Sequence, residues 1–118
     1  MTMTERRIGD VTVLDLGGRL VLEDGVDELR DRIASIVDEG RLKLVLDMAD
    51  LTFVDSCGIG ILISKLVSLR RRGGDLHLLN ITPRGQHLLE ITRLEHVFHC
   101  YTSEADAVGS FPATASGT

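Results

Sequence analysis

The residues best placed to do chemistry are Asp55-Ser56-Cys57-Gly58, a short polar segment between two apolar stretches. The stretch before it, Leu42 to Asp47, has the composition of a strand buried on both faces, and the stretch after it, Gly58 to Arg72, is apolar at helical spacing. The segment is therefore expected at the carboxyl end of a strand, where a helix begins and where α/β proteins often place functional residues. A serine here suits phosphorylation, because the positive end of the helix dipole tolerates an added charge of about −1.5 to −2. We expect phosphorylation of Ser56 to change this surface from neutral to anionic.

Two other roles fit the same segment. Serine is a common N-cap residue, so Ser56 could have the purely structural role of capping the helix, with Asp55 favouring the helix dipole. Cys57 stands near the start of a helix, where a cysteine could serve as a nucleophile or a redox sensor. Because no paired base or resolving cysteine lies near Cys57 in the sequence, we interpret it as a small packing residue.

Three carboxylates near the end of the same strand suggest a magnesium site. Asp47, Asp50 and Asp55 are compatible with the acidic pocket of a phospho-accepting receiver domain. A receiver would also have an acidic pair after its first strand, whereas here Val11–Leu16 leads into Gly17-Gly18. The sequence therefore argues against a receiver.

The rest of the chain excludes several classes of function. His96, His99 and Cys100 do not have the spacing of a zinc site, so neither a metal nor a cofactor is expected. A net charge of −5 with 3% aromatic residues lacks the basic surface of a nucleic-acid-binding protein. The longest apolar run is interrupted at Ser64-Lys65, which argues against membrane insertion, and Met1–Arg7 is too polar for a signal peptide. The two cysteines show no disulfide framework, so a cytoplasmic location is expected.

The hydrophobic pattern predicts one α/β domain over residues 1–110 and a disordered tail over 111–118. Thr4–Ile8 and Val11–Leu16 flank Gly9-Asp10 and predict a hairpin, after which Gly17 to Leu20 leaves the sheet. The later expected elements are a helix ending near Gly40, strand 42–47, helix 58–72, strand 75–79, a helix capped by Thr82-Pro83, strand 97–101 and a short helix 103–109. Alternating strands and helices indicate a mixed, mostly parallel β-sheet of about five strands with helices packed on it.

Several side chains have specific expected positions. Asp24 is expected to be the N-cap of the first helix. In the helix after Ser56, Val67 is expected to be buried, whereas Ile61 is either buried or part of a docking surface. In the following helix Leu88 and Leu89 are expected to face inward, and Ile91 is a further candidate.

Several segments together carry a resemblance to a known family. Residues 54–60, Val-Asp-Ser-Cys-Gly-Ile-Gly, resemble the signature of the bacterial anti-sigma factor antagonists of the STAS domain family, usually Asp-Ser-Ser/Thr-Gly-Leu/Ile-Gly. Gly18-Arg19-Leu20 is similar to the Gly-x-Leu of that family, and residues 46–53 resemble its Leu-Asp-Leu-x-x-Leu-x-Phe. Residues 81–83 and 89–94, followed by Val97-Phe98, resemble its third-helix region.

The resemblance implies a regulatory protein and no enzyme. In this family the unphosphorylated antagonist binds an anti-sigma factor, a serine kinase of the GHKL ATPase type, and so releases the sigma factor for transcription. The kinase inactivates the antagonist by phosphorylating the serine after the aspartate, which is Ser56 here, and a PP2C-type phosphatase restores it. This partner switching implies no direct contact with nucleic acid.

Two departures from the family pattern bear on the partner. Cys57 replaces the second Ser/Thr of the signature, and Val21-Leu22 stands where relatives often have aspartate, in a loop near the partner surface of the family. The residues expected to bind the partner are Arg19, Asp24, Asp55, Ser56, Cys57, Gly58, Ile59 and Ile61. The alternatives are a STAS docking subunit of a sensory or lipid-transport complex and, from a different class, a Cys57-dependent enzyme.

Overall fold

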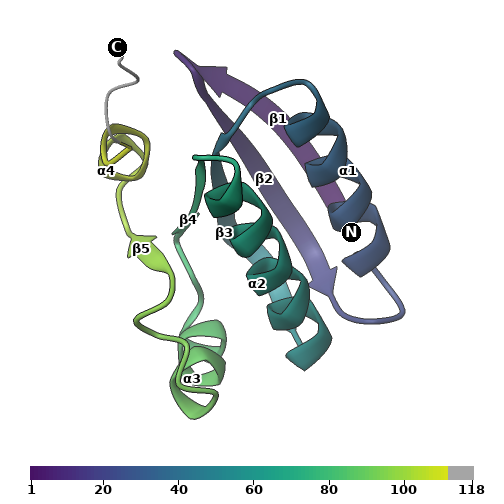
Figure 1. The fold of residues 1–118 in the computed structure, drawn as a ribbon. Coiled ribbons are helices and arrows are strands. Elements are labelled where there is room, and N and C mark those ends of the chain that lie inside the picture. Colours follow the sequence, from purple (N-terminus) through teal and green to yellow (C-terminus); the bar gives the residue numbers. More distant parts are fainter. Residues whose placement is uncertain (112–118) are drawn as a thin grey trace.

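The computed structural model describes residues 1–111, which form a five-stranded sheet with helices packed on it (Figure 1). The elements are β1 (Thr2–Ile8), β2 (Val11–Leu20), α1 (Val26–Asp38), β3 (Lys43–Val54), α2 (Ser56–Arg71), β4 (Asp75–Leu79), α3 (Pro83–Ile91), β5 (His99–Tyr101) and α4 (Glu104–Gly109). The strands lie in the order β1-β2-β3-β4-β5, with β1 antiparallel to β2 and the other pairs parallel. The predicted α/β class, the N-terminal hairpin and the mostly parallel sheet are confirmed.

The central strands are longer than predicted. We expected the chain to leave the sheet at Gly17 and β3 to end at Asp47, but β2 continues to Leu20 and pairs with β3 as far as Val54. Gly17 and Gly18 do not end the strand, because the pairing of β2 with β3 continues past them with a register shift next to each glycine. The extension places the end of β2 directly beside the polar segment that follows β3.

The main hydrophobic core lies between the sheet and the two long helices. Leu14 of β2, Leu46 of β3, Ile33 of α1 and Leu62 of α2 are all fully buried in it. A smaller cluster lies on the other face of the sheet, where α4 packs through Ala107 against strand residues such as Val45. The sheet is thus covered by α1 and α2 on one face and by α4 on the other.

The start of α1 differs from the prediction. Asp24 does not cap the helix, because the N-cap is Gly25 with φ 98° and no side chain bonds the first turn. A Cβ atom at Gly25 would lie 2.7 Å from the Arg19 carbonyl oxygen, so this position requires glycine. Asp24 instead accepts a hydrogen bond of 3.1 Å from the Met1 ammonium group.

Two apolar side chains are more exposed than predicted. Val67 is 41% exposed, because it lies on the outer face of α2, and Ile91 is 63% exposed at the end of α3. Ile61 is buried and Leu89 is fully buried. Among the described residues, no helix has the length and apolar character needed to cross a bilayer.

The end of the chain is described only in part. Of the segment 111–118, for which disorder was expected, only Phe111 is among the described residues. Its ring stacks on that of His77 with 3.9 Å between the ring centroids. The last expected strand begins at His99, later than the predicted residue 97.

Candidate functional site

Asp55 organises the site at the carboxyl end of β3. It is the N-cap of α2, and its Oδ1 atom accepts a hydrogen bond of 2.9 Å from the Gly58 N–H. Its Oδ2 atom accepts a second bond, of 3.2 Å, from the Leu22 N–H in the β2–α1 loop. The Asp55 N–H in turn donates to the Leu20 carbonyl oxygen at 3.3 Å. One aspartate therefore ties the loop after β2 to the start of α2.

Ser56 is left free of the capping role that was considered for it. Because Asp55 is the N-cap, Ser56 is the first residue of α2, two residues earlier than the predicted start at Gly58, and it is exposed. Its hydroxyl lies at the end of a helix whose first N–H groups have no intrahelical partner and carry partial positive charge. This end of a helix favours negative charge.

Gly58 brings α2 close to the two central strands. A Cβ atom there would lie 2.5 Å from the Leu20 carbonyl oxygen and 3.0 Å from Val54 Cγ1. No other residue type fits without movement of the backbone. In contrast, nothing lies within 4 Å of a Cβ atom built on Gly60, which faces solvent.

The other residues expected to bind a partner divide into exposed and buried groups. Arg19 and Cys57 are exposed together with Ser56, and Asp24 and Asp55 are half-buried. Gly58, Ile59 and Ile61 are buried, so their side chains belong to the packing of α2 more than to its outer surface. The structure thus groups the expected residues at one edge of the sheet, with the exposed ones around Ser56.

Two exposed apolar residues near Ser56 were not among the residues expected to bind the partner. Leu22 is 62% exposed, and its N–H is bound by Asp55. Phe53 is 36% exposed just before the end of β3, and the Arg84 guanidinium of α3 lies 5.2 Å from its ring centroid. Their exposure had no signal in the sequence, because apolar residues near a strand end give no periodicity that distinguishes core from surface.

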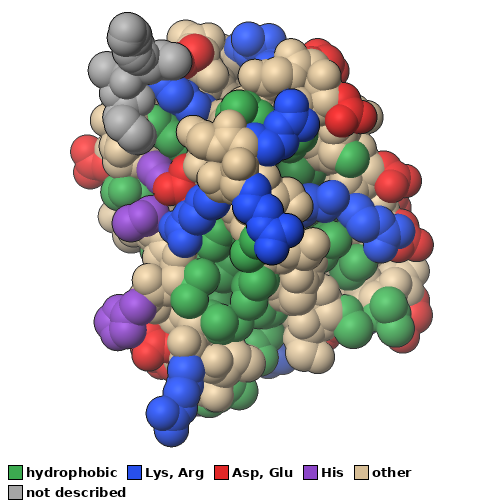
Figure 2. Space-filling model, viewed as in Figure 1, with side chains coloured by type: hydrophobic (Ala, Val, Ile, Leu, Met, Phe, Trp, Pro, Cys, Tyr) green, Lys and Arg blue, Asp and Glu red, His purple; other side chains and the backbone are tan. Residues whose placement is uncertain are grey.

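We call the exposed uncharged side chains of this region the Ser56 surface; the Arg84 guanidinium lies over one of them, Phe53. The surface consists of Leu22, Phe53, Ser56, Cys57, Gly60, Ser64 and Val67, the last five on α2. Figure 2 shows basic side chains gathered over the last turns of α2 and few charged side chains beside its start. A partner that meets the start of α2 therefore encounters apolar and small polar groups.

The chemical alternatives gain no support from the geometry. Asp47 accepts hydrogen bonds from the Ala49 N–H and the Asn80 side chain, and Asp55 is used in capping. In residues 1–111, no group of three or more His, Cys, Asp or Glu side chains could hold a metal ion. Both cysteines are free, exposed thiols.

The comparison with protein families gives one match that spans most of the chain. The model of the STAS domain matches residues 3–107. The chain belongs to the STAS domain family.

Curated and solved relatives of this STAS domain are similar along most of their length. The anti-sigma-B factor antagonist of Staphylococcus aureus is 26% identical over 98 residues, which is 83% of this chain and 87% of the relative. An anti-sigma factor antagonist from Mycobacterium paratuberculosis has a TM-score of 0.82 at 22% identity, with 92% of each chain covered. The phosphorylated form of the Bacillus cell fate determinant SpoIIAA has a TM-score of 0.74 at 21% identity and covers 92% of this chain and 98% of its own. These structures establish the shared fold.

Proposed function

We propose that this STAS domain is an anti-sigma factor antagonist whose binding to its partner is switched by phosphorylation of Ser56. The single observation that carries the proposal is the exposed Ser56 hydroxyl, which is freed from capping by Asp55 at the start of α2. The names of the curated relatives support the same function. The proposed partner is an anti-sigma factor that is a serine kinase of the GHKL ATPase type, and a PP2C-type phosphatase reverses the modification.

The local geometry supports a switch that changes binding without refolding the domain. Asp55 already bonds the Gly58 and Leu22 N–H groups, so α2 and the loop are held in place whether or not Ser56 carries a phosphate. The phosphate adds about −1.5 to −2 charges next to the Asp55 carboxylate. A partner that fits the neutral Ser56 surface must then bury or face this charge, which lowers its affinity for the modified form.

Mass spectrometry of the protein purified from its own cells tests the modification. The intact mass and peptide mapping over residues 42–70 distinguish Ser56 from the other hydroxyl residues of that stretch, which are Thr52, Ser64 and Ser68. We expect a single phosphate on Ser56 that a PP2C-type phosphatase removes and that the Ser56→Ala variant lacks. An unmodified Ser56 under all growth conditions would argue against the switch.

Binding of variants to the GHKL-type kinase of the same organism tests the consequence. Ser56→Ala is expected to bind as the unphosphorylated protein does, and Ser56→Asp to bind at least about tenfold more weakly, or about 1.4 kcal/mol. Ser35→Asp is the matched control, because Ser35 is an exposed helical serine near the end of α1, at the opposite edge of the sheet. Equal binding of Ser56→Ala and Ser56→Asp would make the domain a constitutive docking module.

A further inference from the structure

The outer side of α2 carries uncharged side chains for most of its length and a cation at its far end. Its exposed residues recur at steps of three and four, so they lie along one side of the helix. We call this row the α2 outer face; it consists of Ser56, Cys57, Gly60, Ser64, Val67, Ser68 and Arg71. At about 1.5 Å per residue, Arg71 lies roughly 22 Å along the helix axis from Ser56.

Charge is distributed unevenly between α2 and the rest of the chain. The chain has a net charge of −5, but α2 and its C-cap contain no aspartate or glutamate. Their charged residues are Lys65, Arg70, Arg71 and Arg72, and Figure 2 shows basic side chains gathered over the last turns of the helix. A partner that approaches this end of α2 therefore meets a positive potential on a protein that is acidic as a whole.

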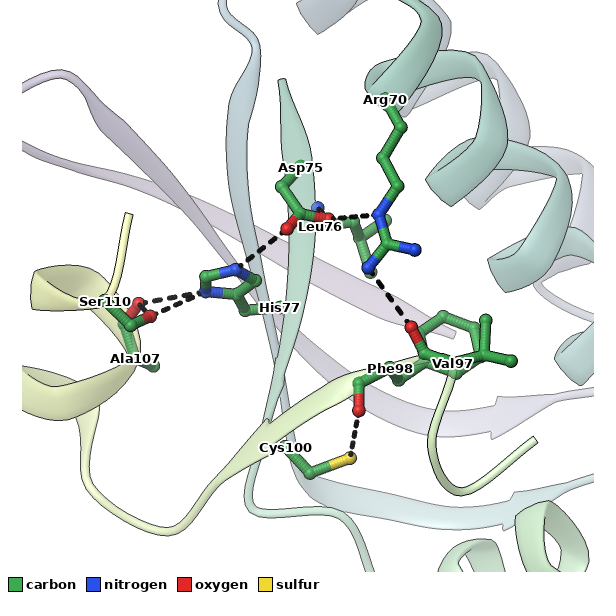
Figure 3. A network of polar contacts seen from close by, with 9 residues as sticks. All are labelled: Arg70, Asp75, Leu76, His77, Val97, Phe98, Cys100, Ala107 and Ser110. Atoms are coloured by element: carbon green, nitrogen blue, oxygen red, sulfur yellow. Dashed lines mark hydrogen bonds and ion pairs between the residues drawn. The ribbon is translucent and has the colours of Figure 1, made fainter. Parts of the chain in front are cut away.

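The first of the three arginines has a structural role. Arg70 Nε donates to Asp75 Oδ1 at 3.0 Å, and its Nη2 atom donates to the Val97 carbonyl oxygen at 3.2 Å (Figure 3). Arg70 thereby joins the end of α2 to β4 and to the segment before β5. Its charge is matched within the domain.

Arg71 has no such contact. It is exposed, and within residues 1–111 no oxygen atom accepts a hydrogen bond from its guanidinium. Glu39, at the end of the neighbouring α1, pairs with Arg41 at 3.1 Å instead. The helix dipole favours a cation at a helix C-terminus, but it does so on any side of the helix. The dipole therefore does not explain why Arg71 lies in line with Val67 and Ser64.

Val67 makes the middle of the α2 outer face apolar. It lies one turn before Arg71 and is 41% exposed. The residues that precede it in the row are small, and nothing lies within 4 Å of a Cβ atom built on Gly60. A helix of another protein can therefore approach α2 closely, cover Val67 and extend as far as Arg71.

We propose that the partner lays an amphipathic helix along the α2 outer face, with its apolar side on Val67 and an acidic side chain paired with Arg71. This inference rests on the proposed function and adds the chemistry of the partner segment that fits α2. Arg71 is then a specificity-determining residue, because a partner without an acid at this point leaves the guanidinium desolvated and unpaired. Ser56 and Arg71 act on the same interface from its two ends.

Binding of the full chain to the GHKL-type kinase of the same organism, measured by surface plasmon resonance at several salt concentrations, tests the role of Arg71. Arg71→Gln is expected to weaken binding by about fivefold or more and to make the association rate less sensitive to salt. Arg72→Gln is the matched control. It removes the same charge from the same helix end, but Arg72 is turned by about 100° around the helix axis, and a change of less than about twofold is expected.

The outcomes separate this inference from the proposed function. Equal losses in Arg71→Gln and Arg72→Gln would show a diffuse attraction, and an unchanged Arg71→Gln would show no contact; either result overturns the inference. If Ser56→Asp still weakens binding in that case, the proposed function stands. A kinase that does not bind the unmodified chain overturns both.

Val67→Ser tests the apolar part of the same contact. It is expected to weaken binding by about fivefold, because the methyl groups that the partner covers are lost. Ile91→Ser is the control, since Ile91 is 63% exposed but lies on α3, off the α2 outer face, and unchanged binding is expected. Thermal unfolding followed by circular dichroism checks that both variants are folded. A Val67→Ser variant that binds as the wild type does would show that the partner does not cover the middle of α2, and this contradicts the proposal.

Discussion

Asp55 and Ser56 are adjacent in sequence but have separate tasks. The carboxylate of Asp55 satisfies the N–H groups of Gly58 and Leu22, which lie in α2 and in the β2–α1 loop. Ser56 takes no part in these bonds and its side chain is exposed. The side chain that holds the site together is therefore distinct from the one that carries the proposed modification, and the two roles can be changed independently by mutation.

The cap can be tested by replacing Asp55 with two residues that differ in their ability to accept a hydrogen bond. Asp55→Ala leaves both N–H groups without this acceptor and is expected to lower the free energy of unfolding by about 1–2 kcal/mol. Asp55→Asn keeps an acceptor oxygen and is expected to lose only a few tenths of a kcal/mol. Urea unfolding at pH 7 measures both. Equal stability of the two variants would show that the cap contributes little.

At the scale of secondary structure, the position of α2 depends on one close contact. The helix begins against the ends of β2 and β3, and a Cβ atom at Gly58 would meet the Leu20 carbonyl oxygen and the Val54 side chain. Carbonyl oxygens of the backbone cannot move away as the end of a flexible side chain can. The close approach is what sets Ser56 at the edge of the sheet beside Leu22.

Two glycines of α2 provide a matched pair for this contact. Gly58→Ala is expected to destabilise the protein by about 1–3 kcal/mol, because the helix must shift to admit the methyl group. Gly60→Ala meets nothing within 4 Å and is expected to stabilise the protein by about 0.5–1 kcal/mol, since alanine is the better helix former. Thermal unfolding followed by circular dichroism measures both. A neutral Gly58→Ala would mean that α2 can move away from the strands at little cost.

The sequence predicted the order of the elements better than their ends. The Thr82-Pro83 cap of α3 and the glycine that ends α1 are local signals, and both predictions are confirmed. The extension of β2 past Gly17 was not predictable, because it depends on pairing with β3, a contact distant in the sequence. The identity of the residue that caps α2 was not predictable either. Asp55 and Ser56 are both suitable N-cap types, and the hydrogen bonds that Asp55 makes with Leu20 and Leu22, at and just after the end of β2, place Asp55 in this role.

In the whole molecule, the two faces and edges of the sheet serve different purposes. The carboxyl edge carries the Ser56 surface, α1 and α2 close the main core, and the second face is held by polar contacts at its margin. The His77 contacts could not be predicted from the sequence, since they join β4 to residues 107–111 near the other end of the chain. Hydrophobic periodicity identifies a buried strand but does not show which polar residue within it is also buried.

A second polar contact, between Arg6 of β1, Asp15 of β2 and Glu104 of α4, makes the free energy of unfolding depend on pH. The Arg6 guanidinium of β1 bonds both Asp15 oxygens, at 2.6 and 3.0 Å, and also pairs with Glu104 of α4. These hydrogen bonds from Arg6 hold the pKa of Asp15 below its ordinary value. The Asp15 carboxylate therefore stabilises the fold above the unfolded-state pKa of about 3.9, and this contribution is lost as the pH falls through the lower pKa of the folded state.

Asp15→Asn is expected to reduce the stability at pH 7 by on the order of 1 kcal/mol or less, because the pair is partly exposed. Between pH 5 and pH 3 its free energy of unfolding is expected to fall less steeply than that of the wild type, since a group that gains protons on unfolding has been removed. Asp38→Asn, on the exposed end of α1, is the control and is expected to keep the wild-type slope. Urea unfolding at several pH values measures these slopes. A wild-type slope in Asp15→Asn would place the acid sensitivity of the domain outside the Arg6–Asp15 pair.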